Sequence, residues 1–270
     1  MVGIATRILV TSSLATCLLL GGTRAAAQAH PYTLETRREV ILTAAGFAMV
    51  VGAIPVRNAQ QTLTLDEIEA LDPNDVNEFD RPATEQWSLG AKNASDVLVL
   101  ALLASPVALT ITEAGRGQST AIGIMYLETF LLTNGMTQLL KGLTNRTRPY
   151  AYNDNPAVPE EDKLDTHAVR SFPSGHTSNA FAAAVFLSST YSKLHPNSVA
   201  RTWVWIGSLT AAGTVGYLRY RAGQHYTTDI IAGAILGASM GYLVPKLHEV
   251  SPVYVAPSEG GLAVGVTMQF

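Results

Sequence analysis

Apolar runs separated by polar stretches dominate the chain and predict an all-α fold built on a six-helix core bundle. Patterns typical of strands are almost absent before the last ten residues. The second run can be capped by Ser95 or Asp96, and Pro106 should kink it. The fourth run is alanine-rich, and its ~15 residues fall short of the ~20 that span a membrane. We expect helices over residues 40–56, 97–111, 120–140, 178–192, 202–217 and 227–244.

Two of these runs carry further information. The third contains Glu128, Asn134 and Gln138, which must face protein or water if this helix lies in lipid. The sixth has glycine at every fourth position, at 233, 237 and 241. This spacing places small residues on one face and allows close helix contact.

Two long loops interrupt the helices. The loop over residues 57–94 is acidic, and because its spacing does not match an EF-hand, we expect a solvated loop rather than a calcium site. The loop over residues 150–169 should lie at the mouth of a pocket, with His167 as a loop histidine rather than a catalytic one. The acidic residues of the first loop include Asp66, Glu67, Glu69, Asp72, Asp75, Glu78 and Asp80.

The N-terminus has the pattern of a secretory signal. Arg7 supplies a positive charge, residues 8–20 are apolar, and small residues at 25–29 offer cleavage sites. Cys17 lies within the apolar stretch rather than after it, which disfavours a lipoprotein. We therefore expect residues 1–29 to be a signal peptide, followed by an N-terminal helix and acidic loop (30–95), the main helical domain (96–247) and a tail (248–270).

Composition narrows the classes of protein. The chain has 270 residues, 47% of them hydrophobic and 14% charged, which is apolar for a soluble protein but mild for a polytopic membrane protein. The net charge of −3 gives no support for nucleic-acid binding. The single cysteine excludes an internal disulfide framework.

The stretch Arg170–Asn179 carries the first candidate chemistry. Pro173 fits the first positions of a helix, and Gly175 lets a ligand approach the backbone closely. The free N–H groups of a first helical turn, with the helix dipole, form a natural anion site. His176 would stand beside the bound anion as a proton donor.

Two other clusters complete a pattern. Lys141 and Arg148-Pro149 precede this stretch, and Arg219, His225 and Asp229 follow it. The order Lys-x6-Arg-Pro, Pro-Ser-Gly-His, Arg-x5-His-x3-Asp resembles the three-part signature of the type 2 phosphatidic-acid phosphatase and vanadium haloperoxidase superfamily. The resemblance covers roughly residues 96–245. One departure is Leu218, where the family usually has serine, which puts one hydrogen bond near the following arginine in doubt.

The pattern predicts a phosphate pocket. Negative charge spreads over the equatorial oxygens of a phosphoryl group during transfer, so cationic donors are needed around it. We assign phosphate binding to Lys141, Arg148, Ser174, Gly175 and Arg219. Because these cations neutralise the charge, we expect neither a metal nor another cofactor.

The two histidines and one carboxylate then take catalytic roles. His225 and Asp229 are four residues apart, so on a helical turn the carboxylate can hold one imidazole nitrogen. His225 is then the nucleophile that forms a phosphohistidine. His176 is the general acid that protonates the leaving alkoxide and afterwards activates water. The family pattern implies the same roles.

Several functions remain open at this point. Export and apolar helices favour lipid phosphates, such as phosphatidic acid, phosphatidylglycerol phosphate or an isoprenyl diphosphate. The alternatives are a non-specific periplasmic acid phosphatase that acts on small phosphomonoesters, a vanadium haloperoxidase and a non-catalytic phospholipid binder.

The location is predicted to be the bacterial cell envelope, with the pocket facing the periplasm and the protein membrane-integral or membrane-associated. The positive-inside rule prefers this orientation, because it places inside the basic residues Arg37, Arg38, Arg116, Lys193, Arg201 and Lys246. A cleaved signal with six crossings would instead place the motifs inside. Either the signal is uncleaved or misread, or one helix does not cross, or the bundle is periplasmic.

The tail over residues 262–270 alternates apolar residues with small or polar ones, which is a strand pattern. It ends in Phe270 and resembles the closing strand of outer-membrane barrels, but one strand cannot make a barrel. We therefore expect an edge strand or a disordered tail.

Overall fold

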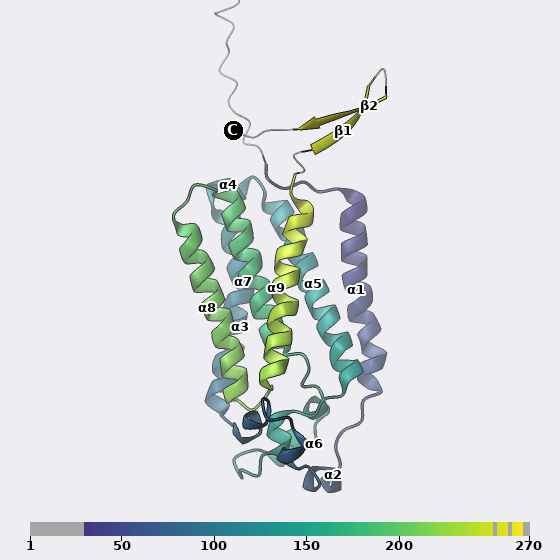
Figure 1. Ribbon diagram of the computed structural model, residues 1–270, viewed down its shortest axis with the longest axis vertical. Helices are drawn as coiled ribbons and strands as arrows, with labels where there is room; N and C mark the ends of the chain where they lie inside the picture. Colours follow the sequence, from purple (N-terminus) through teal and green to yellow (C-terminus); the bar gives the residue numbers. More distant parts are fainter. Residues whose placement is uncertain (1–29, 251–252, 259–260, 267–270) are drawn as a thin grey trace, which may run out of the picture. The chain divides into compact units, whose positions relative to one another are not determined.

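The computed structural model describes residues 30–250, 253–258 and 261–266, so the predicted signal peptide lies outside the described residues. Six long helices run side by side, as the sequence predicts (Figure 1). The all-α fold is therefore confirmed. These helices are α1 (Thr36–Asn58), α3 (Leu89–Ala104), α5 (Ser119–Thr144), α7 (Gly175–Leu194), α8 (Ala200–Arg221) and α9 (Thr227–His248).

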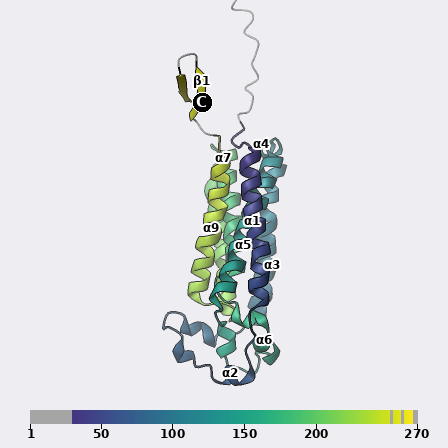
Figure 2. The ribbon, with the colours of Figure 1, turned by 90° about the vertical axis from the view of Figure 1, so that its right-hand side faces the viewer.

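Short elements connect the long helices. Two of them, α2 (Leu65–Glu69) and α6 (Glu160–Leu164), lie below the same end of the bundle in both views (Figures 1 and 2). The long loops therefore have local order, and a capping box between Thr64 and Glu67 starts α2. The others are η1 (Pro73–Asp75), η2 (Arg81–Glu85), η3 (Ser105–Ile111), α4 (Glu113–Arg116), η4 (Pro149–Tyr152) and η5 (Thr166–Val169).

Helix α7 corrects two expectations. It has 20 residues, so the inference of a short fourth helix was wrong. The apolar pattern begins late because the first turn is polar. Ser174 caps the helix, and Pro173 therefore precedes the cap instead of occupying the first turn.

Helix α3 also starts earlier than its apolar run. Ser88 caps it, with Oγ accepting a hydrogen bond from Ala91 N at 3.2 Å, so neither Ser95 nor Asp96 is the cap. The helix ends at Ala104 and continues as η3, which contains Pro106. A proline ring and its missing N–H disfavour continued α-helix, which explains this change.

Close helix packing positions two of the sequence motifs. A Cβ atom added at Gly237 would lie 2.0 Å from Ser178 O, and one at Gly233 would lie 2.6 Å from Ser174 O. The predicted glycine face of α9 therefore packs directly on the backbone of α7. This contact brings the start of α9 beside the start of α7.

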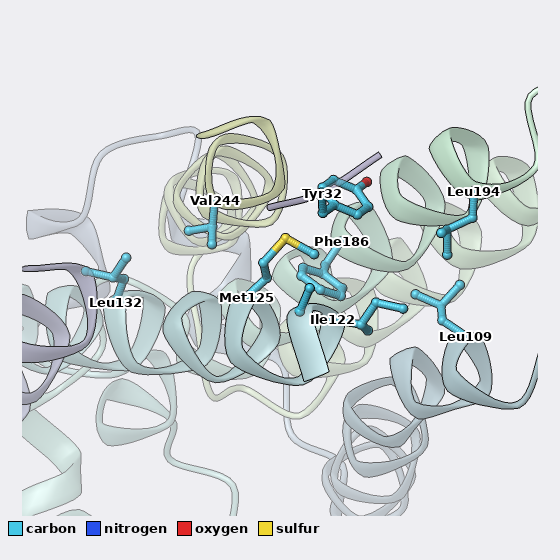
Figure 3. Packing of buried hydrophobic residues seen from close by; sticks show 9 residues of the cluster. Tyr32, Leu109, Ile122, Met125, Leu132, Phe186, Leu194 and Val244 are labelled. Atoms are coloured by element: carbon cyan, nitrogen blue, oxygen red, sulfur yellow. The ribbon is translucent and has the colours of Figure 1, made fainter. Parts of the chain in front are cut away.

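The central core lies farther along the bundle. Met125 and Phe186 are fully buried there, between Val244 of α9 and Ile122 of α5 (Figure 3). Burial of such large apolar side chains is the main favourable term in packing. It ties α5, α7 and α9 into one unit.

The outer faces of the bundle are apolar. Among the described residues, three segments are long and apolar enough to cross a membrane, at Thr36–Asn58, Leu89–Ile111 and Thr227–His248. Large apolar side chains on them stay exposed, such as Phe47 at 61% and Val97 at 70%. Long apolar helices with exposed apolar side chains are typical of lipid contact, and they support a membrane-integral bundle.

A two-stranded hairpin forms near the C-terminus. Strands β1 (Val253–Ser258) and β2 (Gly261–Val266) are antiparallel, with Val253 opposite Val266. The predicted strand therefore exists, but it is paired with a second strand that the sequence analysis missed. Residues 267–270 of the predicted strand lie outside the described residues.

Candidate active site

The three motifs meet at one end of the bundle. Lys141 lies in the last turn of α5, His176 in the first turn of α7 and Arg219 in the last turn of α8. They border a cavity of about 290 Å³. Its lining consists of Arg57, Val99, Leu103, Asn134, Thr137, Gln138, Lys141, Arg148, His167, Arg170, Gly175, His176, Asn179, Arg219 and His225.

Six of the eight predicted site residues line this cavity, and two lie outside its lining. Ser174 is fully buried, and its Oγ lies 2.9 Å from Thr177 Oγ1 and accepts the Thr177 N–H at 3.4 Å. Its hydroxyl therefore serves as a helix cap in this structure. The other residue outside the lining is Asp229.

Buried basic residues surround the cavity, and they are Arg170 and the three predicted phosphate ligands Lys141, Arg148 and Arg219. Lys141 Nζ donates to Arg170 O at 2.7 Å. Arg148 and Arg219 both donate to Gln224 Oε1, the latter at 3.2 Å. Burial lowers the pKa of Arg148, because a charged guanidinium is less stable away from water. This concentration of positive charge favours the binding of an anion.

Asp96 organises the first histidine. His176 Nε2 lies 2.8 Å from Asp96 Oδ1, and Arg219 donates to the same oxygen at 3.2 Å. The sequence predicts Asp96 only as a possible helix cap and gives no sign of this contact. Its position eighty residues before the motif gave no local signal.

His225 lies just before α9, because Tyr226 is the N-cap, so the expected helical turn between His225 and Asp229 is not formed. His225 Nδ1 lies 3.7 Å from Asp229 Oδ2, which is too long for a hydrogen bond. That oxygen accepts from Ser171 Oγ at 2.5 Å and from the Tyr226 N–H at 3.0 Å. Burial, followed by the charges of Lys141 and Arg148, lowers the pKa of His225 and favours its neutral form.

A second layer holds Asp229 in place. Arg146 bridges Asp229 at 2.6 Å and Asp80 at 2.7 Å, and it stacks over the Tyr226 ring at 4.1 Å. Asp80 is fully buried, so the prediction of a solvated acidic loop was wrong at this residue. Burial raises the pKa of Asp80, but hydrogen bonds from Thr228 and then Arg146 outweigh it and lower the pKa below its ordinary value. The one signal in the sequence for these contacts is that Arg146 lies two residues before Arg148 of the first motif.

The second loop contributes to the lining of the cavity. His167 of η5 lines the cavity and also a neighbouring one of about 490 Å³, which shares Arg148, His176 and Arg219. Burial and the charge of Arg148 lower the pKa of His167. The second cavity offers space next to the cationic centre for the rest of a ligand.

The helical bundle brings a cationic cavity and two histidines together at one end, an arrangement suited to binding an anion. Residues 122–251 match the sequence family described as the PAP2 superfamily, and the chain therefore contains a PAP2 superfamily domain.

Two known proteins are similar in sequence to part of this chain. Undecaprenyl-diphosphatase of Sulfolobus acidocaldarius is 29% identical over 132 residues, which cover 49% of this chain and 58% of that protein. Lipid A 4'-phosphatase of Bacteroides thetaiotaomicron is 34% identical over 109 residues, or 38% of this chain and 43% of that protein. The match thus spans about half the length of these curated relatives.

A solved structure is also similar. It is the crystal structure of a transmembrane PAP2 type phosphatidylglycerolphosphate phosphatase from Bacillus subtilis, with 25% identity and a TM-score of 0.41. The match covers 78% of this chain and 92% of that chain.

Proposed function

We propose that this protein is a phosphoric ester hydrolase that acts on lipid phosphates without a catalytic metal. The observation that carries the proposal is that Lys141, Arg148, Arg219, His176 and His225 line one cavity. Three cationic groups match the charge of a phosphoryl group, and two histidines supply the acid and the nucleophile. The names of the matched relatives point to the same reaction class.

The proposed reaction has two steps. In the first, a His225 nitrogen attacks phosphorus, the N–P bond forms and the bond to the leaving oxygen breaks. His176 gives its proton to that oxygen, and Asp96 stabilises the protonated imidazole that this role needs. In the second step water attacks phosphorus, His176 takes the proton of that water, and the N–P bond breaks to release orthophosphate.

The surroundings of the cavity favour a lipid substrate. Val99 and Leu103 of α3 contribute apolar lining, and α3 belongs to a segment apolar enough to cross a membrane. A lipid chain could therefore lie along the bundle while its phosphate enters the cationic centre. The substrate class is thus a phosphate or diphosphate ester of a lipid, in preference to a small soluble phosphomonoester.

Phosphate release from purified full-length protein in detergent tests this function. The panel contains phosphatidic acid, phosphatidylglycerol phosphate, an isoprenyl diphosphate, glycerol phosphate and a nucleotide, each with excess EDTA. We expect release from at least one lipid with the highest kcat/KM of the panel. Equal or better kcat/KM on a soluble ester would overturn the lipid assignment, and loss of all release in EDTA would overturn the metal-free mechanism.

We also propose that the cavity faces the periplasm. Arg37, Arg116, Lys193 and Lys246 lie at helix ends opposite the cavity, which the positive-inside rule places in the cytoplasm. With α7 at 20 residues, the argument for a non-crossing fourth helix loses its basis. Single cysteines at Glu67 and Arg116, in a Cys17→Ser background, should be labelled from outside and inside, respectively; the reverse pattern would contradict this orientation.

A further inference from the structure

A second buried cluster lies away from the cavity. Glu39 of α1, Glu128 of α5 and His248 of α9 each present one ligand atom, and these atoms all lie within 4.8 Å of one another. Glu128 and His248 are fully buried. Thirteen residues separate Glu128 from Lys141 along α5, so the cluster lies about 20 Å from the catalytic centre. The proposed phosphatase reaction does not use it.

Close packing of three helices brings the residues of this cluster together. A Cβ atom at Gly46 of α1 would lie 2.8 Å from Leu131 Cβ of α5, so these helices approach closely. The segment before α1 is tied to the end of α9, since Thr33 N donates to His248 O at 3.0 Å. Three helices therefore converge with their acidic and imidazole side chains facing inward.

Glu128 carries an unsatisfied atom. Its Oε1 accepts from Thr43 Oγ1 at 3.3 Å. Its Oε2 has no hydrogen-bond partner among the described residues, although it lies 3.3 Å from His248 Nε2. A buried carboxylate oxygen without a partner costs free energy, so a cationic ligand at this point is expected to be favourable.

The imidazole of His248 is oriented so that its Nε2 atom can bind a metal ion. His248 Nδ1 lies 2.8 Å from Val244 O, and because a carbonyl only accepts, Nδ1 must carry the proton. Nε2 then offers a lone pair toward Glu39 Oε2 at 2.6 Å and Glu128 Oε2. A histidine that donates its other N–H to a backbone carbonyl is the usual arrangement at metal sites.

The geometry points to a divalent metal site, and we propose that Glu39, Glu128 and His248 bind one Zn²⁺ ion, with water as a fourth ligand. Tetrahedral ligands at about 2.0–2.1 Å lie roughly 3.3–3.4 Å apart. The spacing of 3.3 Å between His248 and Glu128 fits this value, and Glu39 needs to move outward by roughly 0.7 Å. Glu39 is partly exposed, which provides the route of entry.

The ion would hold three helices together. It links the start of α1, the middle of α5 and the end of α9, so it should stabilise the fold without taking part in catalysis. The competing arrangement is a protonated His248 that bridges the two carboxylates by hydrogen bonds alone. That arrangement needs no metal, and the experiment separates the two.

The test uses purified full-length protein, stripped with a chelator, reloaded with Zn²⁺ and passed over a desalting column. We expect about one retained zinc per chain and a Tm rise of about 5–10 °C at a hundredfold excess over Kd. Glu128→Gln and Glu39→Gln should lose both effects. Glu113→Gln, an exposed glutamate in α4, is the matched control and should behave like the wild type.

Co²⁺ provides a second readout, because its visible spectrum reports nitrogen and oxygen ligands directly. We expect a ligand-field band in the wild type that Glu39→Gln abolishes, so the test does not depend on the buried Glu128 variant folding. Absence of retained zinc in the wild type, or equal retention in both glutamine variants, would overturn the proposal in favour of the protonated bridge.

Discussion

The two ends of the bundle hold buried clusters of opposite charge. At the cavity end, Lys141, Arg148 and Arg219 converge around open space, whereas at the other end Glu39 and Glu128 converge on one imidazole. In both places helix packing brings like charges close together, although at the second place Arg38 pairs with Glu39 at 2.9 Å, so that among the described residues Glu128 is the carboxylate with an oxygen that has no partner. An excess of buried charge is tolerated when a counter-ion joins it, so the comparison indicates an anion at one end and a cation at the other.

The largest expected effect is at the cavity end. His225→Ala should reduce kcat by about 10⁴–10⁶-fold, because it removes the nucleophile while leaving the cations in place. Steady-state phosphate release measures this. His195→Ala, at the end of α7 away from the cavity, is the control and should stay near wild type. A His225→Ala variant within tenfold of the wild type would remove His225 from the mechanism.

His176→Ala should have an effect that depends on the leaving group. Loss of the general acid should lower kcat/KM by about 10²–10⁴-fold on alkyl phosphates, whose alkoxide needs a proton. The loss should be smaller on p-nitrophenyl phosphate, whose phenolate leaves unprotonated. The ratio of the two losses is the measurement, and equal losses would contradict the general-acid role.

Packing of α9 on α7 should be the next most sensitive feature. Gly237→Ala places a Cβ 2.0 Å from Ser178 O and should destabilise the bundle by about 1–3 kcal/mol. Gly213→Ala in α8 has nothing within 4 Å of the added Cβ and should be neutral or slightly stabilising. Thermal unfolding in detergent compares them, and equal Tm values would argue against this helix contact.

The smallest expected effect is on pH dependence. The pKa of His225 is lowered by burial and by the cations of the cavity, so the folded protein keeps it neutral below pH ~6.5. The unfolded chain binds that proton near pH 6.5, so His225 should make stability fall as pH decreases below this value, by at most about 1.4 kcal/mol per pH unit. Wild type and His225→Asn unfolding from pH 7.5 to 5 should therefore differ in slope; equal slopes would contradict the lowered pKa.

Much of the fold followed from apolar periodicity. The six helices and the glycine face of α9 were predictable because helix burial imposes a regular pattern. The start of α7 was misplaced because its first turn, Gly175-His176-Thr177, lacks large apolar residues, and Gly175 and His176 border the cavity. Residues that line the cavity therefore interrupt the apolar pattern at the helix start, so the pattern does not show where the helix begins.

The residues of the site were predictable only where they belong to a short sequence motif. The three motifs carry their own spacing, and six of their residues line one cavity. Asp96 and Asp80 come from distant segments and reach the site through tertiary packing, which leaves no periodic trace. The sequence indicates that Glu128 must face protein or water if its helix lies in lipid. Its partners Glu39 and His248 could not be predicted, because they lie 89 and 120 residues away in sequence and belong to no motif.

The central claim is that His225 carries the phosphoryl group during turnover. Rapid acid-free quenching of the reaction with ³²P-labelled substrate, followed by proteolysis and mass spectrometry, identifies the labelled residue directly. The account predicts label on His225 in the wild type, and its accumulation in His176→Ala when hydrolysis is slowed. Label on His176, or turnover of the substrate with no labelled histidine at any quench time, would contradict it.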